Sequence, residues 1–162
     1  MKKNNDITIW SLGDIARAIT EKRTGFNIVS IRSSDAPTGT YDDFEKHRHN
    51  YRDIIIECFD DLRFPEEGFI TPSHEHIRRI LKWAKGKERI AVHCTAGISR
   101  SSAVAYLIAC QRVSPKKAVK ILDPAKHCPN KIVLEIGKEI FKDESICTEY
   151  AEWFEKSYVN FP

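Results

Sequence analysis

The sequence of 162 residues has no apolar run close to the ~20 residues that a membrane-spanning helix requires, so we predict no membrane span. The apolar run after Met1 is too short and too polar for a signal peptide, and we therefore expect a cytoplasmic protein. None of the five cysteines forms a CxxC or CxxH pair, which argues against a metal site. An odd number of thiols is typical of a reducing compartment, and we expect no structural disulfides.

The composition indicates one compact domain spanning residues 1–162. A hydrophobic content of 41% is enough for a single core, and no repeat or low-complexity tract interrupts the chain. The net charge is only +3, and the basic residues gather at 78–89 and 116–120, where such faces are usually solvated. No aromatic stacking motif accompanies them, so we do not expect a nucleic-acid partner.

Apolar segments with strand character alternate with segments of helical periodicity. The expected strands cover residues 7–10, 27–31, 53–58 and 90–93. The expected helices cover residues 12–22 after the cap Ser11, 73–85, 100–111, 115–122, and a last one capped by Asn130 that runs to 141. This order predicts an α/β fold, with a central, mostly parallel sheet of four to five strands flanked by helices on both faces. The run 54–56 of three isoleucines indicates a buried central strand, and 33–50 is the longest expected loop.

The C-terminal segment 144–162 is expected to form a helix packed on the domain. Its apolar stripe consists of Ile146, Tyr150, Trp153, Phe154, Tyr158 and Phe161. We expect a monomer, because most stripes of this kind pack on their own domain. A partner or dimer surface is the alternative.

One segment combines a nucleophile with a phosphate-binding side chain. Cys94 directly follows an apolar strand, and Arg100 opens the next helix after five intervening residues. The intervening loop is long enough to curl around one tetrahedral anion, with its amides and the helix N-terminus directed at that anion. Arg100 presents a planar fork of donors that can hold two phosphoryl oxygens at once. This spacing predicts attack of a thiolate on phosphorus.

We assign the other residues of this segment to binding and support. The expected phosphate-binding residues are Thr95, Ala96, Gly97, Ile98, Ser99 and Arg100. Gly97 permits the positive φ that such a turn often requires. Ser101 is placed to donate a hydrogen bond to the sulfur when the phosphoenzyme breaks down, and His93 is expected to order the loop from behind.

The segment from His93 to Ser101 resembles the signature loop of the cysteine-dependent protein tyrosine phosphatase superfamily. Residues 59–65 and the helical segment after them resemble the general-acid loop of its dual-specificity branch, and 128–130 resembles the Pro-Asn of that branch. The matches extend over residues 27–142 and are similar to small, mainly bacterial, predicted tyrosine phosphatases. The resemblance implies a phosphatase fold, a phosphorylated protein substrate and no cofactor or metal.

A general acid must protonate the leaving oxygen, and such a group contributes typically 10²–10⁴-fold. Asp61 is our candidate, because its distance along the chain from Cys94 and the Asp-three residues-Pro pattern match those of relatives. Asp60 is the alternative candidate. A further alternative is that both aspartates lie in a solvated turn after a strand and have no catalytic role.

The resemblance has gaps that affect the expected substrate. Residues 131–136 lack the aromatic and glutamine often found in dual-specificity members, and no segment resembles the loop that deepens the pocket of larger tyrosine-specific enzymes. The signature loop has no lysine, which argues against highly phosphorylated inositol lipids. Phosphotyrosine is the leading expected substrate, with phosphoserine and phosphothreonine as further ones. The alternatives are an RNA 5′-phosphatase or other non-protein phosphatase, a non-catalytic phosphate-binding module, and a sulfurtransferase.

Cys58 is either a buried thiol or a reversible disulfide partner of Cys94.

Overall fold

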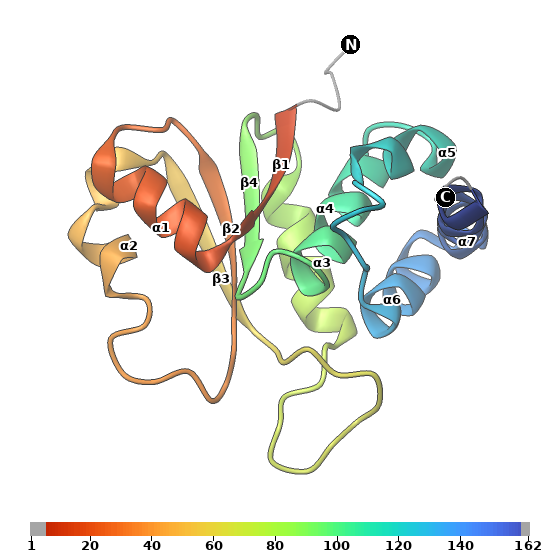
Figure 1. Ribbon diagram of the computed structural model, residues 1–162, viewed down its shortest axis with the longest axis horizontal. Helices are drawn as coiled ribbons and strands as arrows, with labels where there is room; N and C mark the ends of the chain where they lie inside the picture. Colours follow the sequence, from red (N-terminus) through yellow and green to blue (C-terminus); the bar gives the residue numbers. More distant parts are fainter. Residues whose placement is uncertain (1–5, 160–162) are drawn as a thin grey trace.

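The computed structural model describes residues 6–159 and contains a four-stranded, fully parallel sheet between two layers of helices (Figure 1). The strands lie in the order β1 (Ile7–Ser11), β4 (Ile90–Cys94), β2 (Asn27–Arg32) and β3 (Asp53–Cys58). Since all strands are parallel, their C-terminal ends meet at one edge of the sheet, where ligands bind in α/β folds. This architecture confirms the predicted fold class.

Helices cover both faces of the sheet (Figure 1). One face carries α1 (Leu12–Glu21), α2 (Asp42–Lys46) and the 3₁₀ turn η2 (Arg48–Asn50). The other carries α3 (His74–Ala84), α4 (Arg100–Cys110) and α6 (Lys131–Phe141), with α5 (Pro115–Ala118), the 3₁₀ turn η3 (Val119–Ile121) and α7 (Ser145–Val159) further from the sheet.

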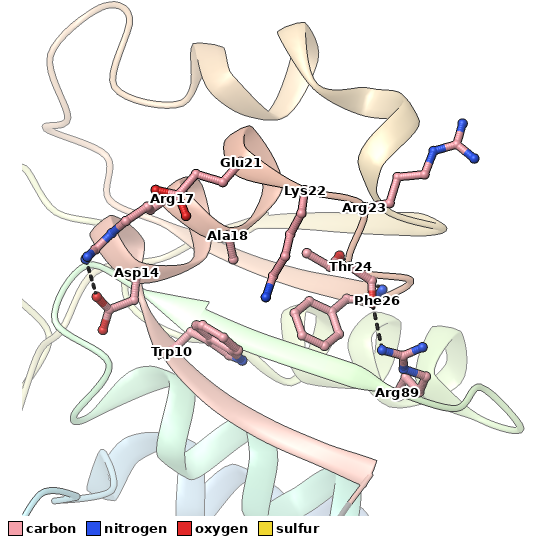
Figure 2. A pocket seen from close by; sticks show the side chains of 10 residues that line it. All are labelled: Trp10, Asp14, Arg17, Ala18, Glu21, Lys22, Arg23, Thr24, Phe26 and Arg89. Atoms are coloured by element: carbon pink, nitrogen blue, oxygen red, sulfur yellow. Dashed lines mark hydrogen bonds and ion pairs between the residues drawn. The ribbon is translucent and has the colours of Figure 1, made fainter.

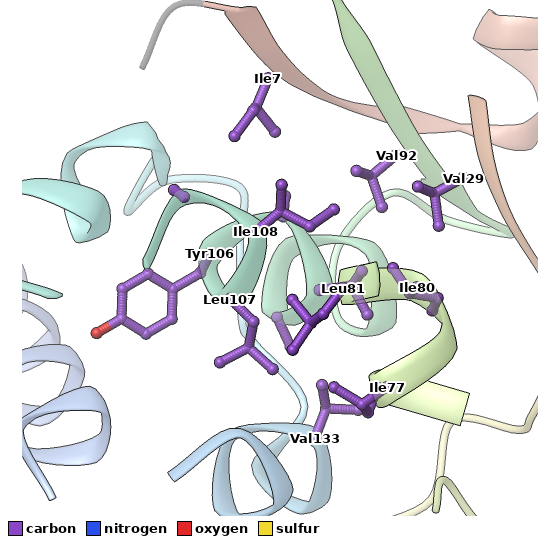
Figure 3. Packing of buried hydrophobic residues seen from close by; sticks show 14 of the residues in the cluster. Ile7, Val29, Ile77, Ile80, Leu81, Val92, Tyr106, Leu107, Ile108 and Val133 are labelled. Carbon is purple, nitrogen blue, oxygen red and sulfur yellow. The ribbon is translucent and has the colours of Figure 1, made fainter. Parts of the chain in front are cut away.

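The larger core surrounds α4, which is buried on all sides except at its last residue (Figure 3). Its sequence explains this position, because serine, alanine and aliphatic side chains occupy every face and leave no polar stripe for solvent. Helix α6 approaches α4 closely at Gly137, where an added Cβ would lie 2.3 Å from a methyl carbon of Leu107. Glycine at position 137 therefore permits this close packing of the two helices.

A smaller core lies between the sheet and the α1–α2 layer. It contains Ile15 and Ile19 of α1, Ile28 and Ala91 of the sheet, and Phe44 of α2. The alternation along β4 explains the division, since Ala91 faces this core while its neighbours Ile90 and Val92 face the larger one.

The two helix caps expected from the sequence are present, and the structure adds a third at Ser73. The Ser11 hydroxyl accepts a hydrogen bond from the Asp14 amide at 3.1 Å, and the Asn130 side chain accepts one from the Val133 amide at 3.1 Å. Ser73 caps α3 in a capping box. These caps set the beginnings of α1, α3 and α6 close to the predicted residues.

The expectation of a central β3 was wrong. β3 lies at the edge of the sheet and pairs only with β2, and Ile56 is 46% exposed. Ile55 packs against the larger core and Ile54 against the smaller one, so the isoleucine run is buried in part on both faces. A continuous apolar run indicates covered faces, but it does not fix the lateral position of a strand.

Two further segments differ from the prediction. The expected loop 33–50 contains α2 and η2, anchored by Phe44, a single buried aromatic that produces no helical periodicity. The helix expected at 115–122 is a short α-helix followed by the 3₁₀ turn η3.

The C-terminal helix α7 contacts the larger core through its N-terminal half. Ile146 is fully buried, its carbonyl accepts a 2.8 Å hydrogen bond from the Tyr106 hydroxyl, and Tyr150 and Trp153 pack against the core. Tyr158 is exposed, and Phe161 lies outside the described residues. Within residues 6–159, no helix has the length and apolar character needed to cross a bilayer.

Candidate active site

The loop between β4 and α4, residues 94–100, lies at the C-terminal edge of the sheet. Cys94 is the last residue of β4 and Arg100 the first of α4, and both are buried. The β4–α4 loop therefore joins the end of an interior strand directly to the N-terminus of the most buried helix. Partial positive charge at that terminus favours an anion in the loop.

The carbonyl groups of the β4–α4 loop are held by amides from outside it. The Leu12 amide donates to the Thr95 carbonyl at 3.1 Å, and the amides of Cys128 and Asn130 donate to the Ile98 and Ser99 carbonyls at 3.0 and 3.1 Å. These contacts come from α1 on one side and the segment before α6 on the other. With three of its carbonyls directed at flanking amides, we expect the loop to direct its own N–H groups at a bound anion.

Gly97 allows the β4–α4 loop to pack against β1. Its φ is +72°, and an added Cβ would lie 2.6 Å from the Ser11 nitrogen and 2.7 Å from the Trp10 carbonyl carbon. Both of these atoms belong to the backbone and cannot rotate away. Glycine is therefore required here for conformation and for space.

Cys94 is supported by residues on both sides of it in the sequence. Its Sγ donates to the Ser101 hydroxyl at 3.1 Å, and its carbonyl lies 3.3 Å from Nδ1 of His93. The His93 ring is fully buried and stacks on Phe44 with a centroid distance of 5.1 Å. The two predicted supporting residues, His93 and Ser101, thus contact Cys94.

The tautomer of His93 follows from its hydrogen bonds. Arg32 Nε donates to the Ser30 hydroxyl at 3.1 Å, and this hydroxyl lies 2.7 Å from Nε2 of His93. Because the Cys94 carbonyl can only accept, Nδ1 carries the proton, and Nε2 of the neutral ring accepts from the Ser30 hydroxyl. Burial lowers the pKa of His93 to about 4, so the ring is neutral at pH 7.

Arg100 makes three hydrogen bonds through its two terminal nitrogens. One terminal nitrogen donates to the Ser33 hydroxyl at 3.0 Å and to the Phe59 carbonyl at 2.9 Å, and the other donates to the Thr95 hydroxyl at 3.2 Å. Its Nε is buried and has no partner within the described chain. A buried unpaired donor on a cation is costly, which indicates that a ligand acceptor belongs there.

Asp60 is a structural residue. Its carboxylate accepts hydrogen bonds from the Ser34 amide at 2.9 Å, the Ser34 hydroxyl at 2.5 Å and the Ile70 amide at 2.7 Å. Burial raises the pKa of Asp60, but these hydrogen bonds outweigh burial and leave the pKa below its usual value. Asp60 fastens the two ends of the β3–α3 loop, residues 59–73, to one another.

Asp61 is exposed and directed at the β4–α4 loop. One carboxylate oxygen accepts from the Ser99 hydroxyl at 2.6 Å and from the side-chain amide of Asn130 at 2.9 Å. The same amide donates to the Leu62 carbonyl at 3.0 Å, which fixes the backbone beside Asp61. Of the two aspartates, the geometry favours Asp61 as the group that meets a bound phosphoester.

A family model described as "Dual specificity phosphatase, catalytic domain" matches residues 15–136. The chain belongs to this family of dual specificity phosphatase catalytic domains. The match includes the β3–α3 loop, the β4–α4 loop and Asn130. No curated protein matches the chain in sequence.

Solved phosphatase structures share the fold of this phosphatase domain. The structure titled Tk-PTP in the active form is 20% identical, covers 88% of both chains and has a TM-score of 0.52. PTP-2 phosphatase of Cydia pomonella is 16% identical, with coverage of 85% of this chain and 88% of its own and a TM-score of 0.58. PTPMT1, solved in complex with PI(5)P, is 15% identical, with coverage of 91% and 96% and a TM-score of 0.56.

Sequence reasoning did not foresee the roles of four residues in the phosphatase site. Ser33 contacts Arg100, Asn130 contacts Asp61, and Arg32 and Ser30 orient His93. Asn130 was expected only as a helix cap and as part of the Pro-Asn resemblance. Ser33 directly follows β2. Because the C-terminal ends of parallel strands meet at one edge of the sheet, this position could have indicated that Ser33 lies near the site.

Two further predictions concern the cysteines and the side chains able to bind a metal. All five cysteines, which lie within the described residues, are free thiols. Burial and the nearby Asp60 charge raise the pKa of Cys58, which keeps this thiol protonated. A reversible disulfide between Cys58 and Cys94 stays a prediction. Over residues 6–159, no cluster of three metal-binding side chains occurs.

A cavity of about 460 Å³ lies beside α1, separate from the β4–α4 loop (Figure 2). The rings of Trp10 and Phe26 form its apolar part, and Arg17 at its rim is paired with Asp14 at 2.9 Å. The Arg89 guanidinium donates to the Thr24 carbonyl at 2.7 Å. None of the cavity's lining residues belongs to residues 94–100, so it does not form the phosphate site.

Proposed function

We propose that this phosphatase domain hydrolyses phosphomonoesters through a cysteinyl-phosphate on Cys94, with phosphotyrosine in proteins as its leading substrate and phosphoserine and phosphothreonine as further ones. The observation that carries the proposal is the buried, unpaired Nε of Arg100 beside the Cys94 loop. A phosphoryl oxygen would satisfy this donor. The catalytic residues are Cys94, Arg100 and Asp61, and residues 95–99 contribute backbone donors.

In the first step, the Cys94 thiolate attacks phosphorus. A sulfur–phosphorus bond forms while the bond from phosphorus to the leaving oxygen breaks, and Asp61 donates its proton to that oxygen. Arg100 and the loop amides hold the non-bridging oxygens and stabilise their charge. Ser99 and Asn130 keep the Asp61 carboxyl beside the loop during this step.

In the second step, water attacks the cysteinyl phosphate. The ionised Asp61 accepts a proton from the water, a phosphorus–oxygen bond forms, and sulfur departs as a thiolate. Ser101, whose hydroxyl is 3.1 Å from Sγ, then donates a hydrogen bond to the departing sulfur. No metal or cofactor takes part in this scheme.

The test measures inorganic phosphate released from p-nitrophenyl phosphate and from a phosphotyrosine peptide. Cys94→Ser is expected to abolish release, because its oxygen is a poor substitute for the thiolate. In Asp61→Ala, p-nitrophenolate is a good enough leaving group to depart without an acid, but hydrolysis of the cysteinyl phosphate lacks its base. The intermediate should therefore accumulate, and mass spectrometry of acid-quenched protein should detect one phosphoryl group on Cys94. Absence of phosphate release from any aryl ester, or full activity of Cys94→Ser, would overturn the proposal.

The same assay separates the alternative substrates. Release from RNA 5′-phosphates and none from peptides would assign the domain to nucleic acid. Tight phosphopeptide binding without turnover by the wild type would indicate a binding module.

We also propose that the protein is a monomer, because the N-terminal half of α7 packs on its own domain. A cytoplasmic location is proposed from the free cysteines, which are typical of a reducing compartment. Light scattering over a range of concentrations tests the monomer, and cell fractionation tests the location.

A further inference from the structure

Exposed apolar side chains concentrate around the candidate active site. Six large hydrophobic residues are exposed within the described chain, and four of them lie in the β3–α3 and β4–α4 loops. These four, named here the apolar rim, are Phe64 at 78% exposure, Phe69 at 44%, Ile70 at 40% and Ile98 at 42%. Exposed apolar groups gathered in one place usually mark a binding surface.

The apolar rim is tied to the two aspartates by short contacts. Ile70 exchanges two hydrogen bonds with Asp60, since its amide donates to the Asp60 carboxylate at 2.7 Å and its carbonyl accepts from the Asp60 amide at 2.8 Å. Ile98 directly precedes Ser99, whose hydroxyl donates to Asp61. Each loop therefore contributes one isoleucine, since Ile98 is next to a residue that contacts Asp61 and Ile70 is hydrogen-bonded to the neighbouring Asp60.

Phe64 and Phe69 extend the apolar rim outward along the β3–α3 loop. Figure 1 shows this loop, in yellow to yellow-green, projecting from the body of the protein below the sheet. The loop ends are fixed by Asp60, while Phe64 has most of its surface in solvent. A substrate whose phosphate occupies the β4–α4 loop would meet these rings with the groups next to its phosphorylated residue.

The charges near the apolar rim select against further negative groups on the substrate. Between Phe64 and Phe69 the β3–α3 loop carries Glu66 and Glu67, and Arg63 is its one cation. The cation of the β4–α4 loop, Arg100, is buried beneath it. A polyphosphorylated headgroup or an anionic membrane surface would face these two glutamates, and Arg63 is the one exposed cation of the loop that would offset them.

We propose that the apolar rim binds apolar side chains that flank the phosphorylated residue of a peptide substrate. This inference rests on the proposed function and names the sequence class of its substrate. The phosphate would supply the electrostatic attraction, and the flanking aliphatic or aromatic groups would bury the rim. An acidic flanking sequence would instead be disfavoured by Glu66 and Glu67.

The experiment compares kcat/KM for two phosphotyrosine peptides that differ only in the residues beside phosphotyrosine, Leu in one and Glu in the other. The wild type is expected to favour the Leu peptide by roughly fivefold or more, since partial burial of each flanking Leu removes at least a methylene's worth of surface from water. Phe64→Ser combined with Phe69→Ser should lower this ratio, and Ile70, Ile98 and the two glutamates should retain part of it. The ratio does not depend on the fraction of folded enzyme.

Ile56→Ser is the matched control, because Ile56 is 46% exposed but lies on the edge strand β3, outside the rim. It should leave the peptide ratio unchanged.

Equal wild-type rates on the two peptides, or faster turnover of the Glu peptide, would overturn the inference while leaving the proposed function intact. Faster turnover of a phosphoinositide in phosphatidylcholine vesicles than of either peptide would also overturn it, in favour of a lipid. If the wild type has no activity on any of these substrates, including p-nitrophenyl phosphate, the proposed function itself is overturned.

Discussion

The two loops that meet at Asp61 are built in different ways. In the β4–α4 loop, residues 94–100, carbonyls are bound by flanking amides, Gly97 contacts the backbone of β1, and Arg100 is anchored by three acceptors. In the β3–α3 loop, residues 59–73, hydrogen bonds hold the ends while the segment 63–69 is exposed. Charge stabilisation requires donors that do not reorganise, whereas contacts to the rest of a substrate tolerate a less constrained surface. From this comparison we expect the first loop to supply the nucleophile and the charge stabilisation, and the exposed segment 63–69 of the second to supply most of the selectivity, while Asp61 acts from the fixed end of the second loop.

The largest contrast is expected from one arginine in each loop. Arg100→Lys removes the planar fork and leaves a point charge, so kcat should fall by about 10³-fold or more, beyond the loss of a single donor. Arg63→Lys, at an exposed position of the β3–α3 loop, should change kcat by less than about twofold, because surface substitutions have small effects. Steady-state kinetics with p-nitrophenyl phosphate compares the two. Similar losses in both variants would contradict the division between the loops.

The adjacent aspartates sharpen the comparison within the β3–α3 loop. Asp61→Asn should lower kcat on a phosphotyrosine peptide by about 10²-fold or more through loss of the general acid, with little change in stability. Asp60→Asn should lower the free energy of unfolding by about 1–3 kcal/mol, since one amide oxygen cannot accept the three hydrogen bonds from Ser34 and Ile70. Urea unfolding and kinetics on both variants separate the two effects. If Asp60→Asn loses activity while remaining as stable as the wild type, the assignment is reversed.

The β4–α4 loop was the part of the site most open to prediction from sequence. Its nucleophile, glycine and arginine are contiguous, and the loop geometry follows from a strand and a helix on either side. The positions of Asn130 and Ser30 depend instead on which distant segments meet at the sheet edge. Local periodicity carries no information on which distant segments come together at this edge.

The fold shows the same limit. Strands and helix caps were predictable because they depend on nearby residues, such as Ser11 at the start of α1. The edge position of β3 was not, since pairing order depends on how the connections cross the sheet. The short helix α2 depends on one buried side chain, Phe44, which occupies the space beneath His93.

A pair of glycines gives a smaller contrast between the loops. Gly97 and Gly68 both have positive φ, +72° and +84°, but only at Gly97 would a Cβ meet backbone atoms. Gly97→Ala should therefore displace the β4–α4 loop and reduce kcat by about tenfold or more, as misplacement of binding groups does. Gly68→Ala carries only the conformational cost, roughly 1 kcal/mol, and should leave p-nitrophenyl phosphate turnover unchanged. Equal activity of the two variants would show that the contact with β1 does not position the loop.

The smallest expected effect concerns the buried ring beneath the β4–α4 loop. Burial lowers the pKa of His93 to about 4, against an ordinary value of 6.5. At a pH between these two values, the unfolded chain binds a proton at His93 that the folded protein does not. The free energy of unfolding should therefore fall as the pH decreases from 6.5, with His93 contributing about 1 kcal/mol between pH 7 and pH 5.5. Urea unfolding of the wild type and of His93→Asn at both pH values isolates this contribution, because the other titrating groups are common to the two proteins. The wild type should lose more stability than the variant over this interval. An equal loss in both would mean that the imidazole is protonated in the folded state, where Nε2 would compete with Arg32 for the Ser30 hydroxyl.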